Sequence, residues 1–267
     1  MRPDSITIGI YQFSISWEDI EANRLKIEHV LKSLTNIPGI ILLPEMYTTG
    51  FSMTPDAINL EKLKDQKSWQ QSLSDLFNTC IIGSVISPQA KDVFANEMLA
   101  TCPGNKEQTY IKRHLFFNEA SLPNYIKGNE RVCFNIRGIN VFPQICYDLR
   151  FPVWSRNDMG YDLLFYAANW PASRQKVWET LLPARAIENQ SYVVGVNRIG
   201  KDGNGIDYVG GSAVYSAKGD CLLQMAKTET FSSLSLSITE LDEFRKKFPV
   251  LDGRDYFEVD KKKADYS

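Results

Sequence analysis

Short, largely apolar runs along the chain alternate with longer segments in which apolar residues recur at the spacing of a helix. Residues 6–10 form a run of strand length, and residues 39–44 form a continuous apolar run typical of a strand buried on both faces. Between them, one apolar stripe recurs at positions 20, 27, 30, 31 and 34, which predicts an amphipathic helix. Ser16 is the predicted N-cap of this helix, with Asp19 three positions on.

Later apolar runs extend this pattern to most of the chain. Strands are predicted at residues 81–86, 93–100, 139–145, 163–168, 192–196, 212–215 and 234–238, and helices at 60–77 and 175–189. Several consecutive strands, around 81–100 and 192–225, have no helix between them, which excludes a purely doubly wound sheet. We therefore predict an α/β protein with two sheets and helices on their outer faces, a four-layer α-β-β-α sandwich.

The composition is that of an ordinary globular protein. Hydrophobic residues make up 43% of the 267 residues and charged residues 23%, and no repeat, low-complexity tract or linker interrupts the chain. We predict a single domain over residues 1–267 with a short polar tail from about residue 252. Thirty Lys and Arg against 32 Asp and Glu leave no basic excess, so nucleic acid is not an expected partner. No apolar run approaches 18 residues, so no membrane-spanning helix is expected.

Cysteine and histidine usage limits the possible chemistry. The five cysteines, at positions 80, 102, 133, 146 and 221, are widely spaced, odd in number and without a C-x-x-C pair, which argues against a disulfide framework or a zinc knuckle. With no signal-peptide core at the start, we predict a cytoplasmic protein with reduced thiols. Only His29 and His114 are present, too few for a typical zinc site, and His29 fits a structural place in the first helix. No metal and no cofactor are expected.

Three reactive side chains follow predicted strands, where layered α/β proteins place functional groups. Glu45 comes directly after the run 39–44, and desolvation at the edge of a core makes a carboxylate a better proton acceptor. Lys112 stands just before an aromatic segment, and a partly buried ammonium can stabilise a developing oxyanion. Cys146 follows the run 139–145 at a predicted tight turn, which would expose its sulfur to a substrate.

Each of these residues also has an ordinary structural explanation when it is taken alone. Glu45 fits a surface loop, Lys112 an exposed basic turn, and Cys146 an inert buried cysteine. A thiol needs a base or a nearby cation to attack well, and Glu45 and Lys112 are of the right chemical types. A thiol–imidazole pair could be built only with His114, which leaves a second mechanism open.

Five segments together resemble the nitrilase (carbon–nitrogen hydrolase) superfamily, whose members use a glutamate, a lysine and a cysteine. The segments are residues 42–51 (LLPEMYTTGF), 110–116 (YIKRHLF), 146–156 (CYDLRFPVWSR), 168–174 (ANWPASR) and 184–190 (ARAIENQ). The resemblance covers roughly residues 6 to 240 and is to the omega-amidase branch rather than to the true nitrile hydrolases.

The resemblance implies a role for each matching residue. Cys146 would be the nucleophile and Glu45 its general base. Lys112 and the backbone N–H of Tyr147 would hold the tetrahedral oxyanion, and Trp170 of the N-W-P motif would form a wall of the substrate pocket.

One position departs from the pattern of the family. The second glutamate, which supports the lysine and the attacking water, falls on Ser121 in an alignment without gaps. Glu119, two residues earlier, is the available carboxylate and could take that place only if the loop is reshaped locally. In the segment 184–190, Glu188 resembles a residue of a packing helix and is predicted to be structural.

The branch resemblance further implies the substrate. It would be the terminal amide of a small dicarboxylate, such as the amide of 2-oxoglutarate or 2-oxosuccinate, and the distal carboxylate would require a cation. The candidates are Arg113, Arg150, Arg174 and Arg198, among which the sequence does not choose. Alternatives are a hydrolase of N-carbamoyl amino acids or other aliphatic amides, and a non-catalytic relative that binds a ligand. By the same resemblance we expect a homodimer or a higher homo-oligomer.

Overall fold

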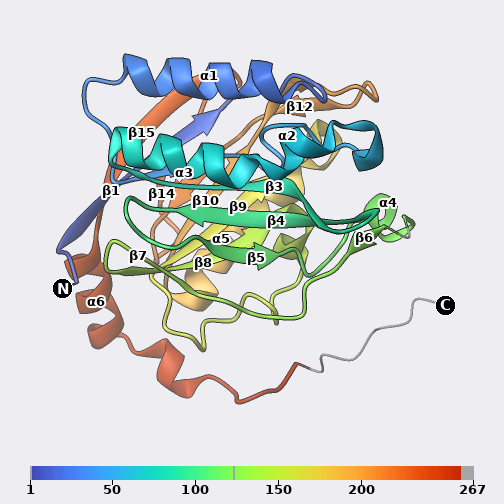
Figure 1. The fold of residues 1–267 in the computed structure, drawn as a ribbon. Coiled ribbons are helices and arrows are strands. Elements are labelled where there is room, and N and C mark those ends of the chain that lie inside the picture. Colours follow the sequence, from blue (N-terminus) through green and yellow to red (C-terminus); the bar gives the residue numbers. More distant parts are fainter. Residues whose placement is uncertain (1, 123, 260–267) are drawn as a thin grey trace.

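Two β-sheets packed face to face form the centre of the protein, with helices on the outside (Figure 1). The computed structural model describes residues 2–122 and 124–259. The predicted α/β class and the α-β-β-α layering are confirmed, with strands at each predicted position. Several short strands were not predicted, because runs of two to four residues carry too little periodicity.

The first sheet has the strand order β15-β1-β2-β3-β4-β5, and β6 pairs with β4. Its strands are β1 (Ser5–Gln12), β2 (Ile40–Leu42), β3 (Cys80–Ala90), β4 (Val93–Thr101), β5 (Gln108–Ile111), β6 (Tyr125–Ile126) and β15 (Thr230–Ser237). β1, β2 and β3 run parallel, whereas β3, β4 and β5 are antiparallel neighbours. Side chains that follow the carboxyl ends of β2 and β5 can therefore contact residues of β4.

The second sheet has the order β14-β13-β10-β9-β8-β7. Its strands are β7 (Phe134–Ile136), β8 (Ile139–Ile145), β9 (Leu163–Ala168), β10 (Tyr192–Asn197), β13 (Ala213–Tyr215) and β14 (Cys221–Gln224), and β11 (Ile199–Lys201) with β12 (Asp207–Val209) forms a separate ribbon. β8, β9 and β10 are parallel, so the loops that follow them lie at one edge of the sheet.

Helices cover both sheets. α1 (Ile20–Ser33) and α3 (Gln66–Phe77) lie side by side over the first sheet, with the short α2 (Leu60–Lys64) before α3 (Figure 1). α5 (Gln175–Asn189) packs on the second sheet at its predicted bounds, and α4 (Phe117–Ala120) and α6 (Ile238–Lys247) complete the set among the described residues. The helix predicted at 60–77 is therefore two helices, which meet at Asp65.

The predicted N-cap of the first helix is wrong. Asp19, not Ser16, caps α1, because its carboxylate accepts a hydrogen bond from the backbone N–H of Ala22. The Ser16 backbone instead exchanges two hydrogen bonds of 2.7 Å with the side chain of Asn23, which holds it outside the helix.

The alternation of side chains along the strands builds two separate cores. Ile40 and Leu42 of β2 belong to the large cluster between the sheets and under α5, whereas Ile41 and Leu43 face α1 and α3. β2 is therefore buried on both faces, as predicted from its continuous apolar run. Glu45 follows directly, which explains how a carboxylate can emerge inside the molecule.

The cysteine prediction needs a correction. Cys80 and Cys102 form a disulfide, although the odd count and wide spacing argued against such a framework. Cys80 is the neighbour of Ile81 on β3, and Cys102 follows Thr101 at the end of β4. Ile81 and Thr101 pair with each other, so the two cysteines lie opposite each other at one end of these strands. Strand register brings them together, and a separation of 22 positions in the sequence gives no sign of it. Cys133, Cys146 and Cys221 are free.

The predicted tail begins in one short 3₁₀ helix, Val250–Gly253. Its last residues, 260–267, lie outside the described residues. Within the described part of the chain, every helix is too short or too polar to cross a lipid bilayer.

Candidate active site

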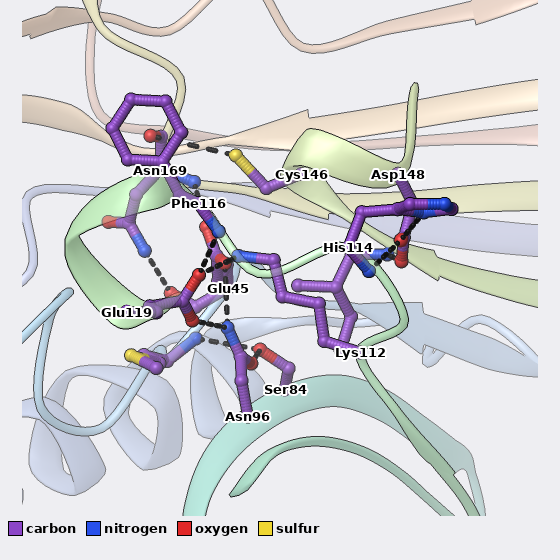
Figure 2. A network of polar contacts seen from close by, with 12 residues as sticks. Glu45, Ser84, Asn96, Lys112, His114, Phe116, Glu119, Cys146, Asp148 and Asn169 are labelled. Atoms are coloured by element: carbon purple, nitrogen blue, oxygen red, sulfur yellow. Dashed lines mark hydrogen bonds and ion pairs between the residues drawn. The ribbon is translucent and has the colours of Figure 1, made fainter. Parts of the chain in front are cut away.

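Glu45 is fully buried between the layers and is held by three donors (Figure 2). Its Oε1 accepts hydrogen bonds from Asn96 Nδ2 and Lys112 Nζ, each at 2.8 Å. Its Oε2 accepts one from the backbone N–H of Asn169, also at 2.8 Å. These three donors fix where the oxygens of Glu45 point.

Lys112 lies at the end of β5 and is also fully buried. Its Nζ is 2.8 Å from Glu45 Oε1 and 2.7 Å from Glu119 Oε2. Burial alone would lower the pKa of this ammonium, but the charges of Glu119 and Glu45 outweigh burial and raise the pKa above its ordinary value. Lys112 therefore carries a positive charge inside the core.

Glu119 comes from α4, and its carboxylate contacts Lys112. Its Oε2 accepts from Lys112 Nζ and from the backbone N–H of Phe116 at 2.8 Å, and its Oε1 accepts from Asn96 Nδ2 at 3.2 Å. Ser121 is exposed and donates its hydroxyl to a backbone carbonyl of the same turn. Burial raises the pKa of the Glu119 carboxyl, Lys112 lowers it and Glu45 raises it, and the sum is a raised pKa.

Cys146 stands on a turn in an unusual conformation. It follows β8, begins a 3₁₀ helix (Cys146–Arg150) and has a φ of 45°, a left-handed value that is costly for a residue with a Cβ. The side chain lies next to Asn169, with Sγ 3.8 Å from the backbone oxygen of that residue (Figure 2). Strain of this kind concentrates at functional sites.

The thiol of Cys146 stays protonated at neutral pH. Its pKa is well above the ordinary value because the side chain is desolvated and because the charge of Glu45 disfavours a thiolate, while Lys112 has a smaller opposite effect. The site therefore does not store a thiolate. A nucleophilic attack by this thiol would need a base that takes the proton, and Glu45 is next to it.

A second buried network joins the strand of Lys112 to the turn of Cys146. Asp148 Oδ2 accepts from Tyr110 Oη at 2.8 Å and from the Ile145 backbone N–H at 3.0 Å. Asp148 Oδ1 lies 2.7 Å from His114 Nδ1, and the His114 ring stacks on Phe151 with 3.7 Å between centroids. The imidazole of His114 thus supports the turn and does not line the cavity at Cys146.

A cavity opens beside Cys146 and Lys112. Tyr147 and Trp170, both predicted to be near the substrate, line it. Apart from two arginines, the rest of the lining combines apolar and aromatic residues with polar ones: Phe51, Met53, Phe116, Asn118, Asn169, Pro171, Asp202, Asn204, Ile206 and Tyr208. The arrangement suits a small ligand with one polar group at the sulfur and another at a distance.

Two of the four candidate arginines line this cavity. Arg150 and Arg174 have their guanidinium groups 5.5 Å from the Trp170 ring and 4.8 Å from the Phe116 ring, respectively. Neither forms an ion pair with an acidic side chain in residues 2–122 and 124–259. Arg113 bonds to Asn129 and a backbone carbonyl outside the cavity. Arg198 is fully buried and does not line the cavity, and its Nε and Nη2 donate to backbone carbonyls.

The structure adds three polar residues that the sequence analysis missed: Asn96, Asp148 and Asn169. Asn96 is a fully buried polar residue in the middle of the predicted strand 93–100, and Asp148 and Asn169 lie inside the motifs already quoted. A polar residue within an apolar run was the available signal. Glu188, predicted to be structural, forms an ion pair of 3.1 Å with Arg185 on α5.

Comparisons with known proteins identify similar chains. The family described as carbon-nitrogen hydrolase matches residues 7–246. Omega-amidase YafV of Escherichia coli K12 is 41% identical over 257 residues, 95% of this chain and 98% of the relative. A 2-oxoglutaramate amidase of Bacillus subtilis is 31% identical over 254 residues, 92% and 96% of the two chains. The crystal structure of XC1258 from Xanthomonas campestris, a CN-hydrolase superfamily protein with an arsenic adduct in its active site, superposes with a TM-score of 0.88 at 34% identity, covering 96% of this chain and 99% of that one.

Proposed function

The chain belongs to the carbon–nitrogen hydrolase family and is an amidase, and we propose that it cleaves the terminal amide of a small dicarboxylate monoamide, of the 2-oxoglutaramate or 2-oxosuccinamate type. The products are the dicarboxylic acid and ammonia. The observation that carries the proposal is the buried cluster in which Lys112 contacts Glu45 and Glu119 beside the thiol of Cys146. Three buried charges are costly to desolvate, and a ligand-binding relative without catalysis would not need them.

In the first half of the proposed reaction, Cys146 acylates itself. Sγ attacks the amide carbon while its proton moves to Glu45, and a C–S bond forms as the carbonyl oxygen becomes negative. The ammonium of Lys112 and the backbone N–H of Tyr147 meet this oxyanion in a cavity largely shielded from water. The C–N bond then breaks, Glu45 returns the proton to the departing nitrogen, and ammonia leaves a thioester.

In the second half, water releases the acid. Glu45 takes one proton from water as its oxygen attacks the thioester carbon, and the second tetrahedral oxyanion meets the same donors. The C–S bond breaks, and the proton held by Glu45 returns to the sulfur. Glu119 keeps Lys112 in place throughout, because it contacts the ammonium together with Glu45 (Figure 2).

The base in this scheme is Glu45 rather than His114. The Nδ1 of His114 is engaged by Asp148, and the ring stacks on Phe151 outside the cavity lining. Glu45 carries the charge that acts most strongly on the thiol among its charged neighbours. A thiol–imidazole hydrolase is therefore disfavoured by the geometry.

A panel of substrates tests the proposed function. The purified protein is expected to release ammonia from 2-oxoglutaramate or 2-oxosuccinamate with a kcat/KM at least about 100-fold above that for an N-carbamoyl amino acid or an aliphatic nitrile, because only the acidic amides offer a carboxylate to the arginines. Coupled ammonia detection measures the rates. A preference for the N-carbamoyl amino acid would instead support the alternative amidase, and no turnover of any amide would contradict the proposal.

We assign the distal carboxylate of the substrate to Arg174, with Arg150 beside it. Arg174→Gln is expected to lower kcat/KM for the acidic monoamide by roughly 10- to 100-fold, the loss of one charge-assisted hydrogen bond in a half-buried site. The rate with the neutral amide of the same length, pentanamide, should change by less than about threefold. Steady-state kinetics on both substrates measure the selectivity.

Matched arginine variants complete this test. Arg150→Gln reports the contribution of the second, exposed arginine, and Arg113→Gln, outside the cavity, serves as the control. Equal losses on the acidic and the neutral amide in Arg174→Gln would mean that Arg174 shapes the pocket and does not bind the carboxylate.

We also propose that the protein is a cytoplasmic homo-oligomer built from a single domain. The resemblance to the family supports assembly, and Ile187 of α5 and Phe248 after α6 leave 54% and 60% of their surfaces exposed. Size-exclusion chromatography with light scattering at micromolar concentration distinguishes a dimer from the 30.4 kDa monomer.

A further inference from the structure

Asn96 occupies the space between the two glutamates of the site. It lies on β4 and is fully buried, and its backbone carbonyl accepts the N–H of Lys112 at 2.9 Å. Its side-chain nitrogen donates to Glu45 Oε1 at 2.8 Å and to Glu119 Oε1 at 3.2 Å (Figure 2). A primary amide has two N–H donors, and both are used here on carboxylates from different segments of the chain.

Ser84 fixes the orientation of this amide. The hydroxyl of Ser84, on β3, donates to Asn96 Oδ1 at 2.9 Å and accepts the backbone N–H of Met46 at 3.0 Å. With its oxygen held by a donor, the amide of Asn96 must present its nitrogen to the glutamates. Met46, next to Glu45, has a φ of 44°, so the same hydroxyl also anchors the strained backbone that carries the base.

The charges around Asn96 explain why a neutral double donor is needed. Two carboxylates, Glu45 and Glu119, share one ammonium, Lys112, so the cluster has one negative charge in excess. The other titratable groups that face it are the thiol of Cys146 and the phenol of Tyr125, both neutral, since their pKa values are raised mainly by burial. A second cation would have to be desolvated, whereas an amide stabilises both anions at lower cost.

We propose that Asn96 is a positioning residue of the amidase site, which holds Glu45 and Glu119 at a fixed spacing and aims Glu45 at Cys146. This inference rests on the proposed function for its kinetic consequences. The loss of Asn96 leaves the cavity lining unchanged, because Asn96 does not reach the substrate pocket. It removes one donor from each carboxylate, so Glu119 becomes easier to protonate and Glu45 is free to turn.

Kinetics of Asn96→Ala give the first test. The variant is expected to lose about 100-fold in kcat with KM within about threefold of the wild type, since misplacing a catalytic group by an ångström costs this much. The acid limb of its rate–pH profile should move to higher pH, because hydrogen bonds to a carboxylate favour the charged form and the variant lacks them. A kcat within threefold of the wild type together with an unmoved acid limb would overturn the proposal.

Two further variants separate positioning from stability. Ser84→Ala keeps the amide but frees its orientation, and should shift the acid limb in the same direction with a kcat loss of about 10-fold. Met98→Leu, which changes a buried apolar residue of β4 at nearly constant volume, is the matched control and should leave the profile unmoved. If thermal melting shows that Asn96→Ala is not folded, Ser84→Ala becomes the deciding variant. An acid limb of its rate–pH profile that stays at the wild-type position would then contradict the inference.

Alkylation of Cys146 keeps this test independent of the substrate. Peptide mass spectrometry after iodoacetamide treatment follows Cys146 and the exposed Cys221 in one sample. In Asn96→Ala the alkylation of Cys146 should be slowed several-fold at neutral pH, because Glu45 is no longer aimed at the thiol, while the alkylation of Cys221 is unchanged. If the alkylation of Cys146 differs in this way between Asn96→Ala and the wild type, but the wild type hydrolyses no monoamide, the substrate proposal is disproved and the role of Asn96 is supported. Identical Cys146 profiles in both proteins would disprove the role of Asn96 alone.

Discussion

Cys146→Ala is expected to abolish amide hydrolysis, with a loss of at least about 10⁴-fold in kcat, because Cys146 is the only cysteine among the described residues that line the cavity. Intact-mass spectrometry checks the cause directly. Wild-type protein quenched during turnover should carry the mass of the acyl group on Cys146, and the variant should carry none. The fold should survive, since the substitution removes a single sulfur atom at the surface of the cavity.

Three serine variants test whether the loss of activity in Cys146→Ala is specific to the thiol of Cys146. Cys146→Ser keeps a hydroxyl at the same place, but a carboxylate base cannot readily deprotonate it, so it should remain below about 1% of wild-type activity. Cys133→Ser and Cys221→Ser, which change the other two free thiols, should retain full activity. An acyl adduct on a residue other than Cys146 would contradict the proposed nucleophile.

Much of the site could be predicted from sequence because Glu45 and Cys146 each follow an apolar run and Lys112 precedes an aromatic one. Glu45 after β2, Lys112 after β5 and Cys146 after β8 lie where a buried strand gives way to a loop, and such loops meet at the edge of a sheet. The sandwich was also predicted from the order of the elements, because consecutive strands without intervening helices require a second sheet.

The residues that connect these three could not be predicted in the same way. Asn96 and Asp148 act through side-chain hydrogen bonds across the molecule, and their partners depend on strand register and on rotamers that no local pattern encodes. The disulfide between Cys80 and Cys102 was missed for the same reason. Glu119 stayed open because its position depends on the path of one short loop, where a shift of two residues changes which side chain reaches Lys112.

Choosing among the arginines also required coordinates. All four candidates are alike in sequence, but neither Arg113 nor Arg198 lines the cavity. Arg174 and Arg150 remain available because neither has an acidic partner within the described ranges. Availability of charge, and not the presence of arginine, is the physical property that decides recognition of a carboxylate.

Lys112→Met is expected to reduce kcat by at least about 10³-fold. One lost oxyanion donor of this kind costs about 3–4 kcal/mol in the transition state, and methionine keeps the volume of the lysine stem. The same change leaves Glu45 and Glu119 buried without a cation, which destabilises a protein by roughly 3–5 kcal/mol. A lower melting temperature is therefore expected as well, and the two effects must be separated.

The double variant Lys112→Met/Glu119→Gln separates the catalytic effect of Lys112 from its effect on stability. Glutamine preserves the shape of Glu119 and removes its charge, so only one buried anion remains without a cation. The melting temperature of the double variant should therefore lie between those of Lys112→Met and the wild type. The activity should not return, since the oxyanion still has no ammonium to meet it. Differential scanning fluorimetry and ammonia release on the same preparations give both readouts. If kcat rose together with the melting temperature, Lys112 would act only by holding the fold, and its proposed part in oxyanion stabilisation would be wrong.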